Sequence, residues 1–251
     1  MSKLDLKETE KKEQTQDPNT VEQRSGLREL FDLFSLTGFV YGPLDSRLNI
    51  RDALEKNLKK PVPPHVNWLF CFGGISLFLF LVQAVTGILL LMYYRPTIAE
   101  AYKSVVFITN SVPFGWLIRG LHHWAANLMI LMVFLHMARV FFYGAYKPPR
   151  DFNWVTGVVL LMLTLGFGFT GYLLPWNQIS YWATTVGTEA PGAVPFIGTY
   201  LTALIRGGQA ISQTTLTRFF AIHIVILPLT IGFFLVGHFF MIRKQGIAGP
   251  F

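Results

Sequence analysis

Four histidines stand as two pairs inside long apolar runs, where their spacing suits metal-centred chemistry. His122 and His136 are 14 residues apart, and His223 and His238 are 15 residues apart. On a helix turning about 100° and rising about 1.5 Å per residue, the first pair points within about 40° and spans about 21 Å, and the second differs by about 60°. Ionisable groups inside a membrane are costly and usually functional, so both pairs are candidate sites.

The spacing of the pairs favours haem over zinc. Zinc takes four ligands around one point, which a separation of about 21 Å along a helix forbids. Haem iron takes two axial imidazoles, so two facing helices predict two bis-histidine haems stacked across a core about 30 Å thick. The alternative is that each histidine only hydrogen-bonds a neighbouring helix.

His123 would point about 140° from His136 and is expected to face a helix, a loop or a propionate. His65 precedes the first run and is expected at the interface.

The runs that carry the histidines predict an all-α membrane protein. The 251 residues are 52% hydrophobic and 14% charged, against about 25% charged in soluble domains. Four runs reach the length of about 20 residues that crosses a bilayer. They predict a four-helix transmembrane bundle binding two b-type haems, with a surface helical loop over 175–217. The predicted spans are 68–94, 116–143, 154–174 and 219–242. Residues 1–44 form a polar extension that is expected to be largely disordered, and 45–251 form the haem-binding domain.

Clusters of basic residues predict the orientation of the spans. Three basic clusters lie before the first span, between the second and third spans, and after the fourth span. Because the number of spans is even, all three clusters lie on the same side of the membrane. They consist of Lys56, Lys59, Lys60, Lys147, Arg150, Arg243 and Lys244. The positive-inside rule makes this side, with the N-terminus, the cytoplasmic or negative (n) side, and the opposite side the p side. The net charge of +7 does not indicate nucleic-acid binding, because no basic stripe with interleaved aromatic residues lies outside the spans.

Glycines repeat the spacing of the first histidine pair. Gly73 and Gly87 are 14 apart in the first span, and so are Gly157 and Gly171 in the third. A flat macrocycle that packs against a helix needs a position without a side chain, so these are candidate haem-packing glycines. Glycine is also common in membrane helices simply because it permits close helix packing.

Three arginines near the histidines are candidate partners of haem propionates. Arg119, Arg139 and Arg218 lie three to five residues from a paired histidine, close to the ends of the spans. A planar guanidinium binds a carboxylate through two hydrogen bonds. The alternative is that these side chains extend to the lipid headgroups.

From about Asp45 to Phe251 the chain resembles the cytochrome b family of quinol:cytochrome c or plastocyanin oxidoreductases, in its short b6-type form. The matching strings are long, and their order and spacing also agree. They are PPHVN at Pro63, WLIRGLHHW at Trp116, LHMARVFFYGAYKPPR at Leu135, NWVTGVV at Asn153, FTGYLLPW at Phe169, TLTRFFAIH at Thr215 and FMIRKQGIAGP at Phe240.

The resemblance implies the histidine pairing and the partner proteins. It places His122 with His223 on the haem nearer the p side, and His136 with His238 on the haem nearer the n side. The expected partners are a subunit-IV-like second half of cytochrome b, a Rieske iron–sulfur protein, a c-type cytochrome and lipids, in a homodimeric complex. No catalytic base is assigned in this chain, because the PEWY string of the longer cytochromes does not occur here.

The resemblance also implies roles for residues outside the pairs. Cys71 falls where the short form attaches an extra c-type haem by a single thioether; the alternative is an inert cysteine that behaves as a small hydrophobe. Arg243 and Lys244 would contact propionates or a quinone. Tyr181 and Trp182 would form a wall of the quinol pocket, or else an ordinary interfacial aromatic cluster.

The function implied is electron transfer coupled to proton translocation. Quinol is oxidised on the p side, electrons cross the haems, and quinone is reduced on the n side. The string HHW at His122 is more like bacterial menaquinol complexes, which favours a bacterial cytoplasmic or other energy-conserving membrane over a thylakoid. Two alternatives remain: a transmembrane dihaem reductase of the ferric or ascorbate kind, and a haem-free transporter that uses the histidines as a proton relay.

Overall fold

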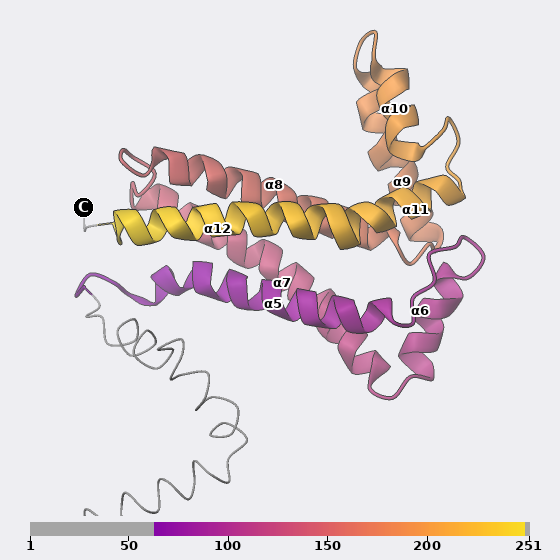
Figure 1. Ribbon diagram of the computed structural model, residues 1–251, viewed down its shortest axis with the longest axis horizontal. Coiled ribbons are helices and arrows are strands. Elements are labelled where there is room, and N and C mark those ends of the chain that lie inside the picture. Colours follow the sequence, from indigo (N-terminus) through magenta and orange to yellow (C-terminus); the bar gives the residue numbers. More distant parts are fainter. Residues whose placement is uncertain (1–62, 249–251) are drawn as a thin grey trace, which may run out of the picture. The chain divides into compact units, whose positions relative to one another are not determined.

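The computed structural model describes residues 63–248, and the predicted extension 1–44 lies outside this range. Every regular element within 63–248 is a helix, and four helical stretches are long and apolar enough to cross a membrane. This confirms the all-α, four-span prediction. The stretches, which run side by side in Figure 1, are Trp68–Leu91, Gly115–Phe142, Asp151–Leu173 and Gln213–Gln245.

The spans are built from the following elements. The first is a 3-10 turn, Trp68–Cys71, that leads into α5, Phe72–Leu91. The second is α7, Gly115–Phe142, and the third is α8, Asp151–Leu173. The fourth is continuous through α11, Gln213–Ala221, a π-helical turn, Ile222–Ile226, and α12, Leu227–Gln245.

The third and fourth helices extend beyond the predicted limits. The third begins at Asp151 rather than at residue 154, and the fourth runs over Gln213–Gln245 rather than 219–242. Hydropathy marks only the part of a helix that is apolar. The polar first turn of α11 is fixed instead by a capping box, in which Ser212 and Thr215 satisfy each other's backbone N–H groups.

The spans pack chiefly as two pairs, α5 against α7 and α8 against α12. Most of their apolar side chains point outward; Phe78 of α5 and Phe233 of α12, for example, are largely exposed. Such faces are expected of a protein whose surroundings are lipid, where every backbone polar group is satisfied within the helix itself.

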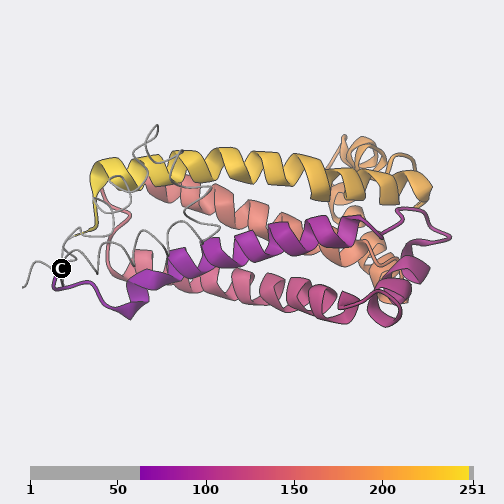
Figure 2. The same ribbon diagram turned by 60° about the horizontal axis from the view of Figure 1, so that its bottom comes forward.

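Short helices gather at one end of the bundle, opposite the end of α12 (Figures 1 and 2). They are α6, Ala101–Asn110, α9, Gln178–Glu189, the 3-10 turn Ala190–Ala193, and α10, Gly198–Arg206. We call this the short-helix end. The helices between the third and fourth spans match the predicted surface helical loop, whereas α6 was not predicted.

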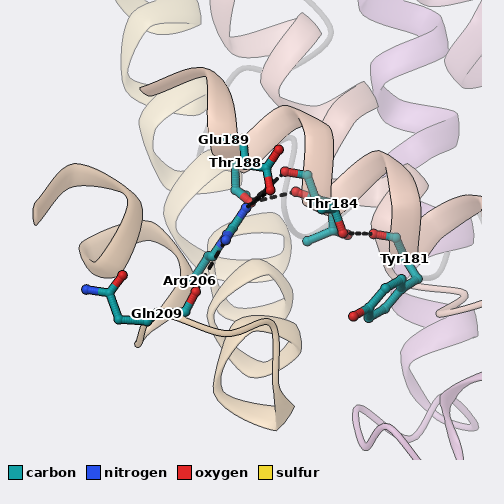
Figure 3. A network of polar contacts seen from close by, with 7 residues as sticks. Tyr181, Thr184, Thr188, Glu189, Arg206 and Gln209 are labelled. Atoms are coloured by element: carbon teal, nitrogen blue, oxygen red, sulfur yellow. Dashed lines mark hydrogen bonds and ion pairs between the residues drawn. The ribbon is translucent and has the colours of Figure 1, made fainter. Parts of the chain in front are cut away.

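A buried arginine fastens the short helices together (Figure 3). Arg206, at the end of α10, donates from Nε to the Thr188 hydroxyl at 2.6 Å and from a terminal nitrogen to the Thr185 carbonyl at 3.0 Å. Its guanidinium also lies 3.5 Å from the carboxylate of Glu189. Its own carbonyl accepts from Thr215 of α11 at 2.8 Å. The guanidinium of Arg206 thus joins α10 to α9, and its backbone carbonyl joins α10 to α11.

The opposite end of the bundle is tied by contacts between loops and the last turn of α12. Arg150 donates to the carbonyls of Gln245 and Ile247, and the Gln245 amide donates to the Pro149 carbonyl. His65 Nε2 lies 2.8 Å from the Ala248 carbonyl oxygen. His65 thus joins the chain before the first span to the chain after the fourth, which fits its expected place outside the spans.

Candidate functional site

The structure brings the four paired histidines together in two tiers. His122 of α7 and His223 of the fourth span lie close enough to interact electrostatically, and so do His136 of α7 and His238 of α12. We call His122 and His223 the near tier, because they lie toward the short-helix end, and His136 and His238 the far tier. All four rings are only partly buried.

Each imidazole lies against one of the four predicted glycines on the neighbouring helix. In the near tier, a Cβ added at Gly87 would lie 3.3 Å from His122 Cε1, and one at Gly171 would lie 2.7 Å from His223 Cε1. In the far tier the corresponding distances are 3.0 Å from Gly73 to His136 and 3.7 Å from Gly157 to His238. The glycines therefore leave room for the histidine rings themselves, while packing against a macrocycle stays a prediction.

A threonine hydroxyl lies beside Nδ1 of three of these rings. The distances are 2.8 Å from Thr86 to His122, 2.9 Å from Thr170 to His223 and 3.3 Å from Thr156 to His238. Because Nδ1 is engaged on one side of the ring, Nε2 on the other side is left to bind a metal. Sequence reasoning missed these threonines, although each directly precedes a predicted glycine.

The π-helical turn removes the apparent misalignment of the second pair. The Leu227 N–H donates to the Ile222 carbonyl five residues back, so this turn holds one residue more than an α-helical turn. Because the π-helical turn holds one extra residue, His223 and His238 are related as if they were 14 residues apart in a regular helix. The directions of their side chains should then differ by about 40°, as those of His122 and His136 do in α7. Pro228 follows the turn; it has no N–H and its ring would clash with the carbonyl four residues earlier, which disfavours a regular helix here.

The predicted arginines lie in different surroundings. The guanidinium carbon of Arg139 lies 3.4 Å from the centre of the Phe70 ring, and its buried Nε has no hydrogen-bond partner among residues 63–248. Arg218 donates to the Leu204 carbonyl, and Arg119 is exposed. The Nε–H group of Arg139 is therefore without a hydrogen-bond acceptor among residues 63–248. The guanidinium of Arg218 instead hydrogen-bonds the backbone of α10 at the short-helix end.

The remaining predicted residues lie near the ends of the spans. Cys71 is exposed at the end of the 3-10 turn that precedes α5. Arg243 and Lys244 are exposed in the last turn of α12. His123 is exposed, with its ring edge-on to Trp124. The expectation that His123 faces a helix, a loop or a propionate stays a prediction.

A groove of about 560 Å³ runs beside α9 at the short-helix end. Its lining is mostly apolar: Tyr172, Gln178, Ile179, Trp182, Ala183 and Val186. Trp182 therefore lies in the groove wall, whereas Tyr181 is not among the lining residues and packs edge-on to Trp176 and Trp182. Whether this groove takes quinol stays a prediction. Asn177 caps α9 by accepting from the Ser180 N–H at 2.8 Å, which fixes where α9 begins.

The glycine contacts predict a graded response to added methyl groups. Gly171→Ala should displace the His223 ring and remove most of the near-tier haem, because a Cβ at 2.7 Å cannot be accommodated without movement. Gly157→Ala is the matched control, since its Cβ at 3.7 Å makes an ordinary contact. Haem per protein, measured by the pyridine haemochrome, checks both. Equal haem content in the two variants would contradict the role given to these contacts.

Comparison with known proteins decides the family. Residues 57–246 match the family described as Cytochrome b/b6/petB. The chain belongs to the cytochrome b/b6 family. It is 51% identical to cytochrome b6 of Synechococcus elongatus (strain ATCC 33912 / PCC 7942 / FACHB-805) over 84% of this chain and 98% of that one. It is 49% identical to cytochrome b6 of Euglena gracilis, again over 84% of this chain and 98% of the relative.

A solved structure agrees with this assignment. A chain of a hyperthermophilic respiratory complex III superposes with a TM-score of 0.77 at 32% identity, over 84% of this chain and 56% of that chain. The cytochrome b6-like chain thus spans little more than half the length of that relative. As a cytochrome b/b6, it is an integral, multi-pass electron-transfer subunit of a bc or b6f-type membrane complex, and the family implies b-type haem.

The described residues fit that cofactor. In each tier an imidazole of α7 lies within electrostatic range of an imidazole of the fourth span. For three of the four rings Nδ1 is engaged, so Nε2 is left for iron. Glycines on α5 and α8 provide the space in which the rings lie.

Proposed function

We propose that the chain carries two b-type haems for quinol oxidation coupled to proton translocation, with His122 and His223 as axial ligands in the near tier and His136 and His238 in the far tier. The observation that carries this proposal is the pairing of imidazoles from two helix pairs, each against a glycine. Haem, when bound, supplies reversible one-electron chemistry, while the protein sets its ligands and surroundings.

At the short-helix end, the residues of this chain would bind and orient quinol. The groove beside α9 offers Trp182 and other apolar side chains to a quinone ring. The Arg206 contacts hold α9, the helix that carries most of the groove residues, to α10 (Figure 3). Tyr181 packs edge-on against Trp182 and does not line the groove. Quinol oxidation at this end requires the base of a partner, a subunit-IV-like second half, and a Rieske protein and c-type cytochrome as acceptors.

At the opposite end, basic residues would serve propionates and quinone. Arg139 presents a buried Nε without a partner in the described part of the chain, which a carboxylate would satisfy. Arg243 and Lys244 lie exposed in the same region, and Cys71 is accessible there for a single thioether to a third, c-type haem. This end is the n side in the proposal, with electrons arriving from the p side and quinone reduced here. The proposal further places the complex as a homodimer in a bacterial energy-conserving membrane.

The test is to isolate the intact complex and identify its haems and subunits. A reduced-minus-oxidised spectrum should show two b-type haems per chain, and a haem stain of the denatured chain should label wild type but not Cys71→Ser. Co-purified subunits should include an iron–sulfur protein and a second-half subunit. Absence of b-type bands would favour a haem-free transporter. Haems without a covalent one, and without those subunits, would favour a dihaem ferric or ascorbate-type reductase.

A further inference from the structure

The four glycine contacts share one sequence pattern, with a single exception. Thr86 precedes Gly87, Thr156 precedes Gly157 and Thr170 precedes Gly171, whereas Phe72 precedes Gly73. Each threonine lies next to the ring that its glycine contacts. The residue before the glycine therefore decides whether a hydroxyl lies beside Nδ1 of the histidine. The His223 and His238 rings also hydrogen-bond the backbone at Phe167 and Asn153, whereas Nδ1 of His122 has Thr86 as its hydrogen-bond partner.

The direction of these hydrogen bonds follows from the backbone. Thr86 and Thr170 donate their hydroxyl protons to carbonyls four residues earlier, at 2.6 and 2.7 Å, and Thr156 donates to one three residues earlier, at 2.8 Å. A hydroxyl has one proton, so its oxygen is left to accept from the imidazole. Nδ1 must then carry the hydrogen, and Nε2 keeps the lone pair.

His136 lacks this contact. Phe72 offers no hydroxyl, and Nδ1 of His136 is buried without a hydrogen-bond partner in the part of the chain that the structure describes. The chain before Phe72 is the 3-10 turn Trp68–Cys71 rather than a continued α-helix. The other three glycines lie well inside α5 or α8, with regular helix before them. The far tier thus has one contact at 3.3 Å, whereas the near tier has two, at 2.8 and 2.9 Å.

We propose that Thr86, Thr156 and Thr170 are positioning residues that fix the Nδ1-protonated tautomer of their histidines and strengthen them as iron ligands, and that Phe72 leaves His136 the weaker donor. The inference rests on the proposed haem ligation. A hydrogen bond accepted from Nδ1–H raises the basicity of a ligating imidazole. A more basic ligand stabilises ferric iron, so these contacts should lower the midpoint potential of the haem that they serve.

Opposite changes at Thr86 and Phe72 test this inference in the isolated complex. Thr86→Val removes the hydroxyl while keeping the shape, and should move the near-tier midpoint potential positive without moving the far-tier one. Phe72→Thr adds a hydroxyl beside His136 and should move only the far-tier potential negative. Redox titration of the b-type absorbance measures both. Comparison with a His122→Ala complex assigns the tiers.

Matched variants separate positioning from packing. Thr164→Val is the control, because Thr164 is buried in α8 and donates to the Leu160 carbonyl of its own helix at 2.8 Å, with no hydrogen bond to a histidine among residues 63–248; both potentials should stay unchanged. Thr86→Ser should retain the wild-type potential. If Thr86→Val keeps both haems at wild-type potentials, or Thr164→Val shifts a potential equally, the inference is wrong. A wild-type complex without b-type haem would instead contradict the proposed function.

Discussion

A His122→Ala variant is expected to lose one of the two b-type haems and to keep the other. Removal of one axial imidazole leaves near-tier iron with His223 alone, and a haem held by one ligand in a site built for two should dissociate or become high-spin. The far-tier histidines lie about 21 Å away along the helices, so their haem should remain. The reduced-minus-oxidised amplitude should therefore fall by about half, if each haem contributes equally.

The adjacent His123 provides a control for this substitution. His123 is exposed and contacts Trp124, so His123→Ala should retain both haems in wild-type amounts. His136→Ala should remove the far-tier haem in the same way. Retention of both b-type absorbances in His122→Ala or His136→Ala would contradict the pairing. Loss of a haem in His123→Ala would show that the helix is turned differently from the structure.

Shortening the fourth span at its π-helical turn is expected to preserve both haems. With Val225 deleted and Pro228→Leu introduced, the turn can become α-helical, and His223 and His238 are then 14 residues apart, as His122 and His136 are. The register of the rings should survive, because the turn already holds one extra residue. The proline is replaced because, in a regular helix, it would cost about 3 kcal/mol.

The same deletion in α7 should have the opposite result. Helix α7 has no such turn between its histidines, so deletion of Leu131 rotates His136 by about 100° relative to His122 and should abolish bis-histidine ligation in at least one tier. Haem content and the low-spin spectrum of the purified variants distinguish the two outcomes. If both deletions abolish haem binding, the π-helical turn does not absorb the extra residue.

The sequence predicted the bundle because the spans are set by apolar length, which hydropathy reads directly. It did not predict α6. The buried residues of this helix, Ala101, Ser104 and Ile108, recur at helical spacing, but the segment is short and its buried face mixes polar and apolar residues. It also placed helix ends only where apolar residues end, and so missed the polar turn of α11. Those ends depend on capping, which is a local hydrogen-bonding property.

Within the site, residue types and spacing predicted which side chains meet but not how they are held. Glycines and histidines share a 14-residue spacing, and this spacing indicated that Gly87 could contact His122 and that Gly171 could contact His223. A regular-helix angle of about 60° for His223 and His238 concealed the π-helical turn, for which Pro228 was the sequence signal. The role of Arg206 depends on loops that fold around it, and no short-range pattern marks it.

The packing of α5 with α7 and of α8 with α12 has a consequence for assembly. In the proposed arrangement each helix pair would supply one ligand and one glycine-lined face to both haems, so neither pair alone would hold a complete site. Bound cofactor would then bridge the first half of the bundle to the second. When iron porphyrin is depleted during biosynthesis, the α5–α7 pair should separate from the α8–α12 pair before either pair unfolds. The supply of iron porphyrin would then set how much mature subunit accumulates.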